Sequence, residues 1–124
     1  WDQFNLRSNE VPCRGDAAYG VCFMLPDAPE GVFEYVAGYE VFPDDPIPAG
    51  MVSRKVPART WAVFEHRGAF NTLGATYQRI YQEWIPTSAY RSTSDGLDME
   101  VYTDEFKFGA PDSVMYIYVA VMPR

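Results

Sequence analysis

The chain has 124 residues, of which 48% are hydrophobic and 22% charged, a composition typical of one soluble globular domain rather than two. Its formal net charge is −7, with only ten Lys and Arg, which argues against a nucleic-acid surface because phosphate binding needs clustered basic side chains. The two cysteines, Cys13 and Cys22, and the single histidine, His66, match no metal spacing. We therefore expect no metal, no cofactor and no nucleic acid bound by this domain alone.

The sequence contains no signal peptide, no apolar run of membrane-spanning length and no lipidation signal. We therefore expect a cytoplasmic protein that does not enter a membrane. The first residue is Trp1 rather than Met, so residues of the natural protein can precede it.

The first third of the chain is predicted to contain a helix end and two strands, separated by turn-forming residues. Residues 1–6 have the apolar spacing of the end of an amphipathic helix, and residues 18–24 and 32–41 are typical of strands joined by a hairpin connection at 25–31. Residues 43–50 contain three prolines and indicate a linker.

After the linker, residues 51–56 and 58–66 are strand-like and are separated by Pro57. Residues 98–103 and 113–122 are predicted as two further strands.

The clearest helical pattern spans residues 71–85. Asn71 or Thr72 can cap this helix and Pro86 is expected to end it. Its apolar side chains recur at helical spacing: Leu73, Tyr77, Ile80, Tyr81 and Trp84.

The final strand has no charged side chain on either face. Tyr116 and Tyr118 share one face, whereas Ile117, Val119 and Val121 share the other. We expect the aliphatic face to pack under helix 71–85. The tyrosine face either lines a cavity or belongs to an ordinary core or interface. The high aromatic content, 16%, leaves the same choice open, because aromatic side chains fill cores and also line sites for flat organic ligands.

The predicted elements suggest two similar halves, 1–42 and 51–124, on either side of linker 43–50. Residues 34–37 echo residues 117–120. This echo predicts that Phe33 and Tyr35 face the same way in the first half as Tyr116 and Tyr118 do in the second.

Five short motifs in order resemble the GyrI-like, or effector-binding, domains that form the ligand-sensing part of several bacterial multidrug-responsive transcription regulators. The similarity covers essentially the whole chain, and its motifs lie at residues 1–4, 19–22, 37–41, 56–68 and 81–86.

The resemblance implies a single α+β effector-binding domain over residues 1–124. Its fold would consist of duplicated strand-helix-strand-strand halves around a central antiparallel sheet. It also implies that the chain begins inside the first helix, so that the first strand is missing and one sheet edge is unpaired. The implied ligand is a lipophilic, often cationic, small molecule in an aromatic cavity. A fused or separate transcription-regulator partner and a homodimer remain open.

One position departs from the drug-sensing members of this family. There, a buried glutamate precedes the final Ile-Tyr-Ile run, and this position is occupied here by Tyr116. A phenol carries no full negative charge at pH 7. Glu65 could replace the carboxylate if strand 61–66 pairs antiparallel with 116–121, although a solvated rim position is equally compatible with the sequence. Glu34 and Glu40 are further candidates.

The sequence thus predicts a non-enzymatic binding module for aromatic and cationic molecules. Two alternatives from the same resemblance are an inhibitor or modulator of the DNA gyrase type and a hydrolase of cyclopropane-bearing toxins. We expect no catalytic residue and consider His66 structural. The candidate ligand-binding residues are Phe33, Tyr35, Trp61, Glu65, Tyr81, Trp84, Tyr116 and Tyr118.

Overall fold

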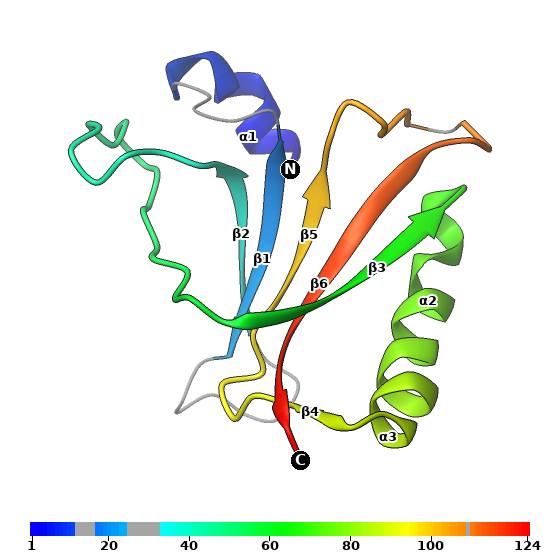
Figure 1. Cartoon of the computed structure of the whole chain (residues 1–124). Coiled ribbons are helices and arrows are strands. Elements are labelled where there is room, and N and C mark those ends of the chain that lie inside the picture. Colours follow the sequence, from blue (N-terminus) through cyan, green and yellow to red (C-terminus); the bar gives the residue numbers. More distant parts are fainter. Residues whose placement is uncertain (12–16, 25–32, 109) are drawn as a thin grey trace.

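The structure is a computed structural model that describes residues 1–11, 17–24, 33–108 and 110–124. A twisted antiparallel sheet forms its centre, and helical segments lie beside it (Figure 1). The strands are β1 (Ala18–Met24), β2 (Phe33–Tyr39), β3 (Thr60–Arg67), β4 (Tyr90–Ser92), β5 (Asp98–Tyr102) and β6 (Val114–Pro123). The helical segments are α1 (Asp2–Arg7), η1 (Ser8–Glu10), η2 (Phe70–Thr72), α2 (Leu73–Arg79), η3 (Ile80–Trp84) and α3 (Ile85–Thr87).

The α+β class is confirmed, and most predicted elements appear within two or three residues of their expected bounds. The hairpin connection at 25–31 lies outside the described residues. Residues 51–56 were expected to form a strand, and this expectation is wrong because the segment has no ladder partner in the described part of the chain. Strand β4 was not predicted, since three residues carry too short an alternation to detect.

The second helix differs from its prediction at both ends. Neither expected cap forms by a side chain: Ala69 is the N-cap of η2 and Thr72 that of α2, both without a capping hydrogen bond, while the Thr72 hydroxyl donates to the Ala69 carbonyl. Pro86 does not end the helix but lies inside its last turn, which continues to Thr87. A proline is tolerated there because it occupies the first turn of α3, which follows the π-turn of η3.

The sheet order is β2-β1-β5-β6-β3, and β4 pairs with the end of β6. At its centre, β1 and β5 form five pairs whose middle pair is Gly20 with Glu100. Gly20 also pairs with Ala37 in β2, as Glu100 does with Ile117 in β6. The two halves therefore have the same arrangement around this central pair. In each half, the strand at the centre (β1 or β5) pairs on its other side with the strand that follows it in the chain (β2 or β6).

This register shows that the predicted echo between residues 34–37 and 117–120 is wrong. Ala37 corresponds to Ile117, so Tyr35 corresponds to Met115 and not to Tyr118. The proposed alignment was displaced by an odd number of residues, and such a displacement exchanges the two faces of a strand. Tyr35 accordingly lies on the face of Val119, opposite to Tyr118.

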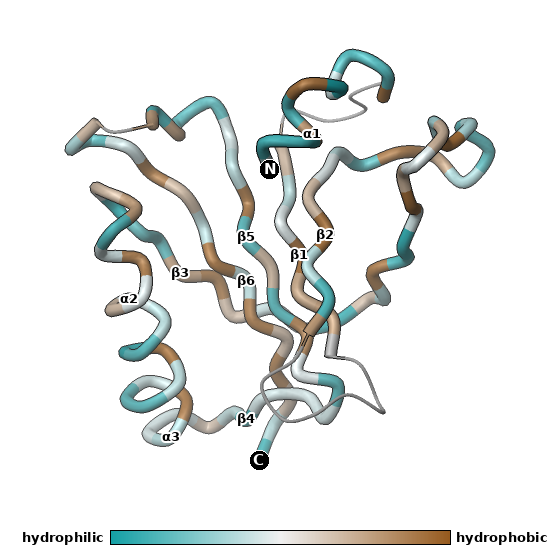
Figure 2. Tube along the Cα trace, turned by 180° about the vertical axis from the view of Figure 1, so that it is seen from behind, coloured by the Kyte–Doolittle hydropathy of each residue, from teal (hydrophilic) through white to brown (hydrophobic). Residues whose placement is uncertain are grey.

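The two faces of the sheet are packed differently. On one face, fully buried Ile117 and Val119 pack with Ile80 of η3 and Ile85 of α3, which confirms the predicted position of the aliphatic side of β6 under the helix. The same face also carries α1, because Phe4 packs edge-on against Tyr39. This surface is called the helix face below. The opposite face holds a smaller cluster around Val21, Leu97 and Ala120. Figure 2 shows the hydrophobic colour concentrated along β6.

Candidate functional site

Three phenol hydroxyls converge on the carboxylate of Glu100 at the centre of the helix face. Tyr35 of β2 and Tyr102 of β5 each donate to Oε1 at 2.8 Å, and Tyr77 of α2 donates to Oε2 at 3.0 Å. Trp1 donates its indole N–H to the Tyr35 hydroxyl at 2.7 Å. Neutral donors from both halves of the domain thus solvate one carboxylate.

The position of these groups follows from strand alternation. Asp98, Glu100 and Tyr102 are alternate residues of β5, so all three point to the helix face beside Ile117 and Val119. Tyr35 reaches Glu100 over Gly20, which lies between them in the sheet. A Cβ atom at Gly20 would lie 1.9 Å from the Tyr35 hydroxyl oxygen, so only glycine leaves room for this contact.

The hydroxyls that surround Glu100 remain protonated over the whole physiological range. Burial raises the pKa of Tyr35, Tyr77 and Tyr102 well above the ordinary value, and the negative charge of Glu100 raises it further. In the described part of the chain, no ion pair involves Glu100. The site therefore holds a negative charge among neutral hydrogen-bond donors.

A second carboxylate, that of Asp98, lies next to Glu100 on the same face. Tyr81 of η3 donates its hydroxyl to Asp98 Oδ2, and Cys22 lies opposite Asp98 in β1. Burial raises the pKa of Asp98, and the nearby charge of Glu100 acts in the same direction. Burial also raises the pKa of the Cys22 thiol to about 12, with Asp98 adding to the effect.

An aromatic pocket of about 330 Å³ opens beside this cluster. Two of its walls, Trp1 and Tyr102, belong to the hydrogen-bond network of Glu100, and their rings meet edge-on at 5.4 Å. Phe70 contacts Tyr102, Phe106 and Phe108 through its ring. The pocket also contains one carboxylate, that of Asp2. Its walls suit a flat aromatic molecule.

The eight residues predicted from the sequence fall into two groups. Tyr35 and Tyr81 reach the two carboxylates of the helix face. Phe33 lies on the same face of edge strand β2, 51% exposed. Trp84 packs edge-on against Phe64 at 5.0 Å.

The other four predicted residues lie on the opposite face of the sheet. Trp61 and Tyr118 contact each other there, with ring centroids 6.1 Å apart. Tyr116 pairs in register with Glu65 and donates its hydroxyl to Glu105 at 2.8 Å. The antiparallel pairing that was expected to bring Glu65 to Tyr116 is therefore confirmed, but it joins them away from Glu100.

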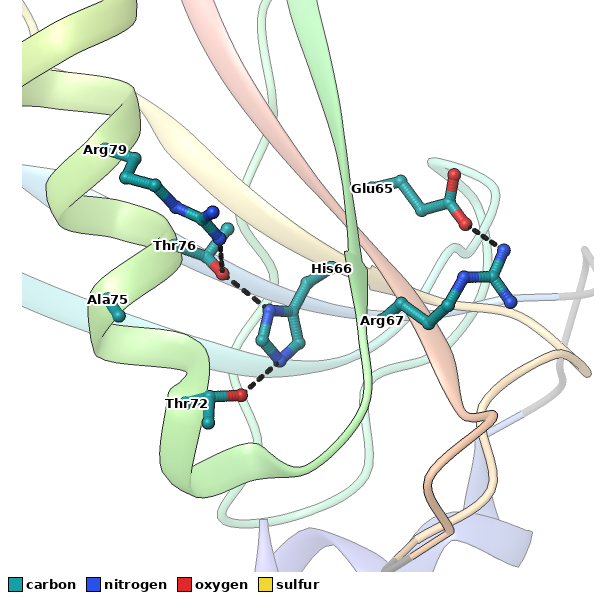
Figure 3. A pocket seen from close by; sticks show the side chains of 7 residues that line it. All are labelled: Glu65, His66, Arg67, Thr72, Ala75, Thr76 and Arg79. Atoms are coloured by element: carbon teal, nitrogen blue, oxygen red, sulfur yellow. Dashed lines mark hydrogen bonds and ion pairs between the residues drawn. The ribbon is translucent and has the colours of Figure 1, made fainter.

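Glu65 and His66 border a separate hollow of about 280 Å³ between the end of β3 and α2. Figure 3 shows that Glu65 points away from the helix and pairs with Arg67. His66 points toward the helix, with Nδ1 2.7 Å from the Thr76 hydroxyl and Nε2 3.1 Å from the Ala69 carbonyl oxygen. Because a carbonyl only accepts, Nε2 carries the proton and Nδ1 accepts from Thr76. The buried ring thus joins β3 to α2, which is a structural role.

Glu100 and Asp98 were missed by the sequence analysis. The signal was present, since Asp98, Glu100 and Tyr102 alternate with apolar Met99 and Val101. Such alternation ordinarily indicates a solvated polar face. Here the helices cover that face, and tyrosines from other elements supply the hydrogen bonds. Of the other two glutamates considered, Glu34 pairs with Arg54, and Glu40 is exposed.

Two observations concern other kinds of site. Within the described ranges, no three potential metal-binding side chains gather in one place. Nor does any described helix have the length and apolar character needed to cross a membrane.

Antiparallel strands that carry helices on one face, with a phenol-ringed carboxylate beside an aromatic pocket, make this an α+β domain with a candidate ligand site. The chain belongs to the GyrI-like small molecule binding domain family, whose model matches residues 1–122. It is also similar to the transcriptional regulator BrlR of Pseudomonas aeruginosa, with 33% identity over 124 residues. That alignment covers 98% of this chain and 44% of the regulator, so the chain spans less than half of this curated relative.

Proposed function

We propose that this domain binds lipophilic aromatic cations without transforming them, with the positive charge beside Glu100 and the aromatic rings in the adjacent pocket. The observation that carries the proposal is the Glu100 carboxylate, which receives three phenol hydroxyls but forms no ion pair among the described residues. A partly buried carboxylate without a countercharge attracts a cation more strongly than a solvated one does, because the surroundings screen it less.

The aromatic walls support the same class of ligand. Trp1 and Tyr102 belong both to the pocket walls and to the hydrogen-bond network of Glu100, so a molecule in the pocket reaches the carboxylate once one of the phenols is displaced. A cation over an aromatic face gains on the order of 0.5 to 2 kcal/mol, and flat ligand rings gain further from burial against Phe70 and Phe106. The net charge of −7 favours the approach of cations in general.

We also infer that binding serves sensing rather than chemistry. The curated relative is a transcriptional regulator, which supports a role for this domain as the ligand-responsive part of a regulatory system. Cys22, the thiol beside the two carboxylates, has a pKa of about 12 and is a poor nucleophile at neutral pH. Turnover of a cyclopropane-bearing electrophile, followed by mass spectrometry, would contradict this part of the proposal.

The proposal is tested by fluorescence anisotropy with the cationic dye rhodamine 6G. We expect Glu100→Gln to weaken dye binding at least about tenfold, which corresponds to about 1.4 kcal/mol. Binding of Nile red, a neutral lipophilic dye, should change much less, because it does not depend on the carboxylate charge.

Glu105→Gln is the matched control. It removes the same charge, but Glu105 is exposed and bonds Tyr116 on the opposite side of the sheet. We expect this variant to bind rhodamine 6G within about twofold of the wild type. Equal weakening by both substitutions would mean that only net charge matters, and unchanged binding in Glu100→Gln would remove Glu100 from the site.

A further inference from the structure

Asp98 is less well solvated than Glu100, although the two carboxylates are neighbours. They are alternate residues of β5 on the helix face, and the strand repeat separates their backbone positions by about 7 Å. Glu100 receives hydroxyls on both oxygens. Asp98 receives the Tyr81 hydroxyl on Oδ2 and has the Cys22 thiol beside it as a weak donor, whereas its buried Oδ1 has no hydrogen-bond partner among the described residues. An inaccessible carboxylate oxygen without a donor is costly, and a ligand that supplies one relieves that cost.

Among the described residues, the groups that face Asp98 are neutral or negative. Cys22 lies opposite it in β1, Tyr81 reaches it from η3, and Glu100 follows it in β5. Tyr77 of α2 lies near enough for the charge of Asp98 to raise the pKa of its phenol. In the described part of the chain, no ion pair involves Asp98. The two carboxylates therefore form a doubly negative site, and one bound positive charge leaves half of it uncompensated.

Two parallel tyrosines give this pair of carboxylates a defined geometry. The rings of Tyr77 and Tyr81 stack with an interplanar angle of 6° and a centroid distance of 6.5 Å. Tyr77 donates to Glu100, and Tyr81 donates to Asp98. The two hydroxyls thus mark two donor positions, one at each carboxylate. Tyr81 is 37% exposed, so its ring can rotate outward and vacate its position for a ligand.

We propose that Asp98 is a second cation subsite and that the domain therefore prefers aromatic dications, with positive groups about 7 Å apart, over monocations of the same shape. This inference rests on the proposed function, since it places the first positive charge at Glu100. Asp98 acts here as a specificity-determining residue. It adds affinity mainly for a ligand that brings a second positive group.

The preference is also expected to depend on pH. Because burial, and after it the charge of Glu100, raises the pKa of Asp98, this carboxylate takes up a proton at a higher pH than an ordinary aspartate does. The dication then loses its second partner. The affinity ratio of dication to monocation should fall as the pH is lowered through the raised pKa of Asp98, while binding of the monocation changes less.

A matched pair of probes tests this inference: p-xylylenediamine has two ammonium groups, and 4-ethylbenzylamine replaces one of them by a methyl group of similar size. Their affinities are measured by displacement of rhodamine 6G. For the wild type at pH 8 we expect the diamine to bind at least about tenfold more tightly than the monoamine. In Asp98→Asn the two probes should bind within about twofold of each other, because the loss of affinity falls mainly on the diamine.

The variants separate the two proposals. If rhodamine 6G binds in a Glu100-dependent manner but the wild type does not distinguish the two amines, the Asp98 subsite is overturned and the proposed function stands. A preference that persists in Asp98→Asn also overturns it. If neither the dye nor the amines bind the folded wild type, both proposals fail.

Discussion

Gly20 and Glu100 lie directly opposite each other at the centre of the β1–β5 ladder, and the missing side chain of the first provides the space for the tyrosine that binds the second. The Tyr35 hydroxyl passes over Gly20 and donates to Glu100 at 2.8 Å. Glycine usually destabilises the interior of a strand, but at position 20 the absence of a side chain is required for the Tyr35–Glu100 contact.

Substitution Gly20→Ala should therefore disturb the Glu100 network. The new Cβ would lie 1.9 Å from the Tyr35 hydroxyl oxygen and 2.6 Å from Cζ, so the phenol must rotate away and lose its bonds to Glu100 and Trp1. The lost hydrogen bond to charged Glu100 costs about 1.5 to 3 kcal/mol, and alanine in a strand regains about 0.5 to 1 kcal/mol relative to glycine. We therefore expect a net loss of about 1 kcal/mol or more in the free energy of unfolding. Urea denaturation measures this change.

Gly74→Ala is the control for that substitution. A Cβ at Gly74 meets nothing within 4 Å, and Gly74 lies inside α2. Alanine there should raise the free energy of unfolding by about 0.5 to 1 kcal/mol. A Gly20→Ala variant as stable as Gly74→Ala would contradict the steric role of Gly20.

Asp98→Asn should be more stable than the wild type at pH 7. The pKa of Asp98 is raised in the folded state, first by burial, so the folded protein holds the proton more tightly than the unfolded chain does. The contribution of Asp98 to stability is then fully present below its unfolded pKa and is lost as the pH rises through the folded pKa. Asparagine cannot ionise, so Asp98→Asn avoids the stability that the wild type loses when Asp98 becomes charged.

The comparison is made with urea midpoints of both proteins between pH 4 and pH 7. The advantage of Asp98→Asn should be largest at pH 7 and should shrink toward pH 4. Other carboxylates titrate in both proteins and cancel in the difference. A difference that stays constant with pH would show that the substitution acts by packing rather than by charge.

The Cys22 thiol should react slowly in the folded protein. Its pKa is raised from 9.0 to about 12, which lowers the thiolate fraction at pH 8 roughly 1000-fold. In a Cys13→Ser variant, we expect iodoacetamide to alkylate Cys22 slowly at pH 8. Mass spectrometry measures the rate. Alkylation should accelerate in Asp98→Asn, because the charge of Asp98 contributes to the raised pKa. A native rate equal to that of the urea-unfolded chain would refute this expectation.

Trp1 should report ligand binding more strongly than the other tryptophans. It lines the aromatic pocket and bonds Tyr35, whereas Trp61 packs on Tyr118 at the opposite face. Tetraphenylphosphonium, a lipophilic cation that does not absorb tryptophan emission, should quench the fluorescence of the wild type and of Trp61→Phe. The quenching should largely disappear in Trp1→Phe. The reverse pattern would place the ligand at the Tyr118 face.

The sequence predicted the elements better than the site. Strands 18–24 and 98–103 were found because their residues are strand formers bounded by turn signals, and the helix was found because its apolar side chains recur over four turns. These patterns are local. Which face of each strand meets the helices depends on register between segments distant in sequence, and the mistaken echo between 34–37 and 117–120 placed Tyr35 on the face of Tyr118.

The same limitation explains why Glu100 was overlooked. An alternating acidic strand predicts a solvated face when it is considered alone. The burial of Glu100 becomes visible only when Tyr35, Tyr77 and Tyr102 are brought from three elements to its oxygens. Tyr116 was given the position of the family's carboxylate, whereas in the structure it bonds Glu105 on the opposite face, and the carboxylates of Asp98 and Glu100 lie on the helix face.

The most direct test of the account is a crystal structure of the protein with bound rhodamine 6G. The account predicts dye rings against Trp1 and Tyr102 and the positively charged end beside Glu100, with at least one of the three phenols displaced from the carboxylate. A dye molecule bound between Trp61 and Tyr118 on the opposite face, with the Glu100 network intact, would contradict it.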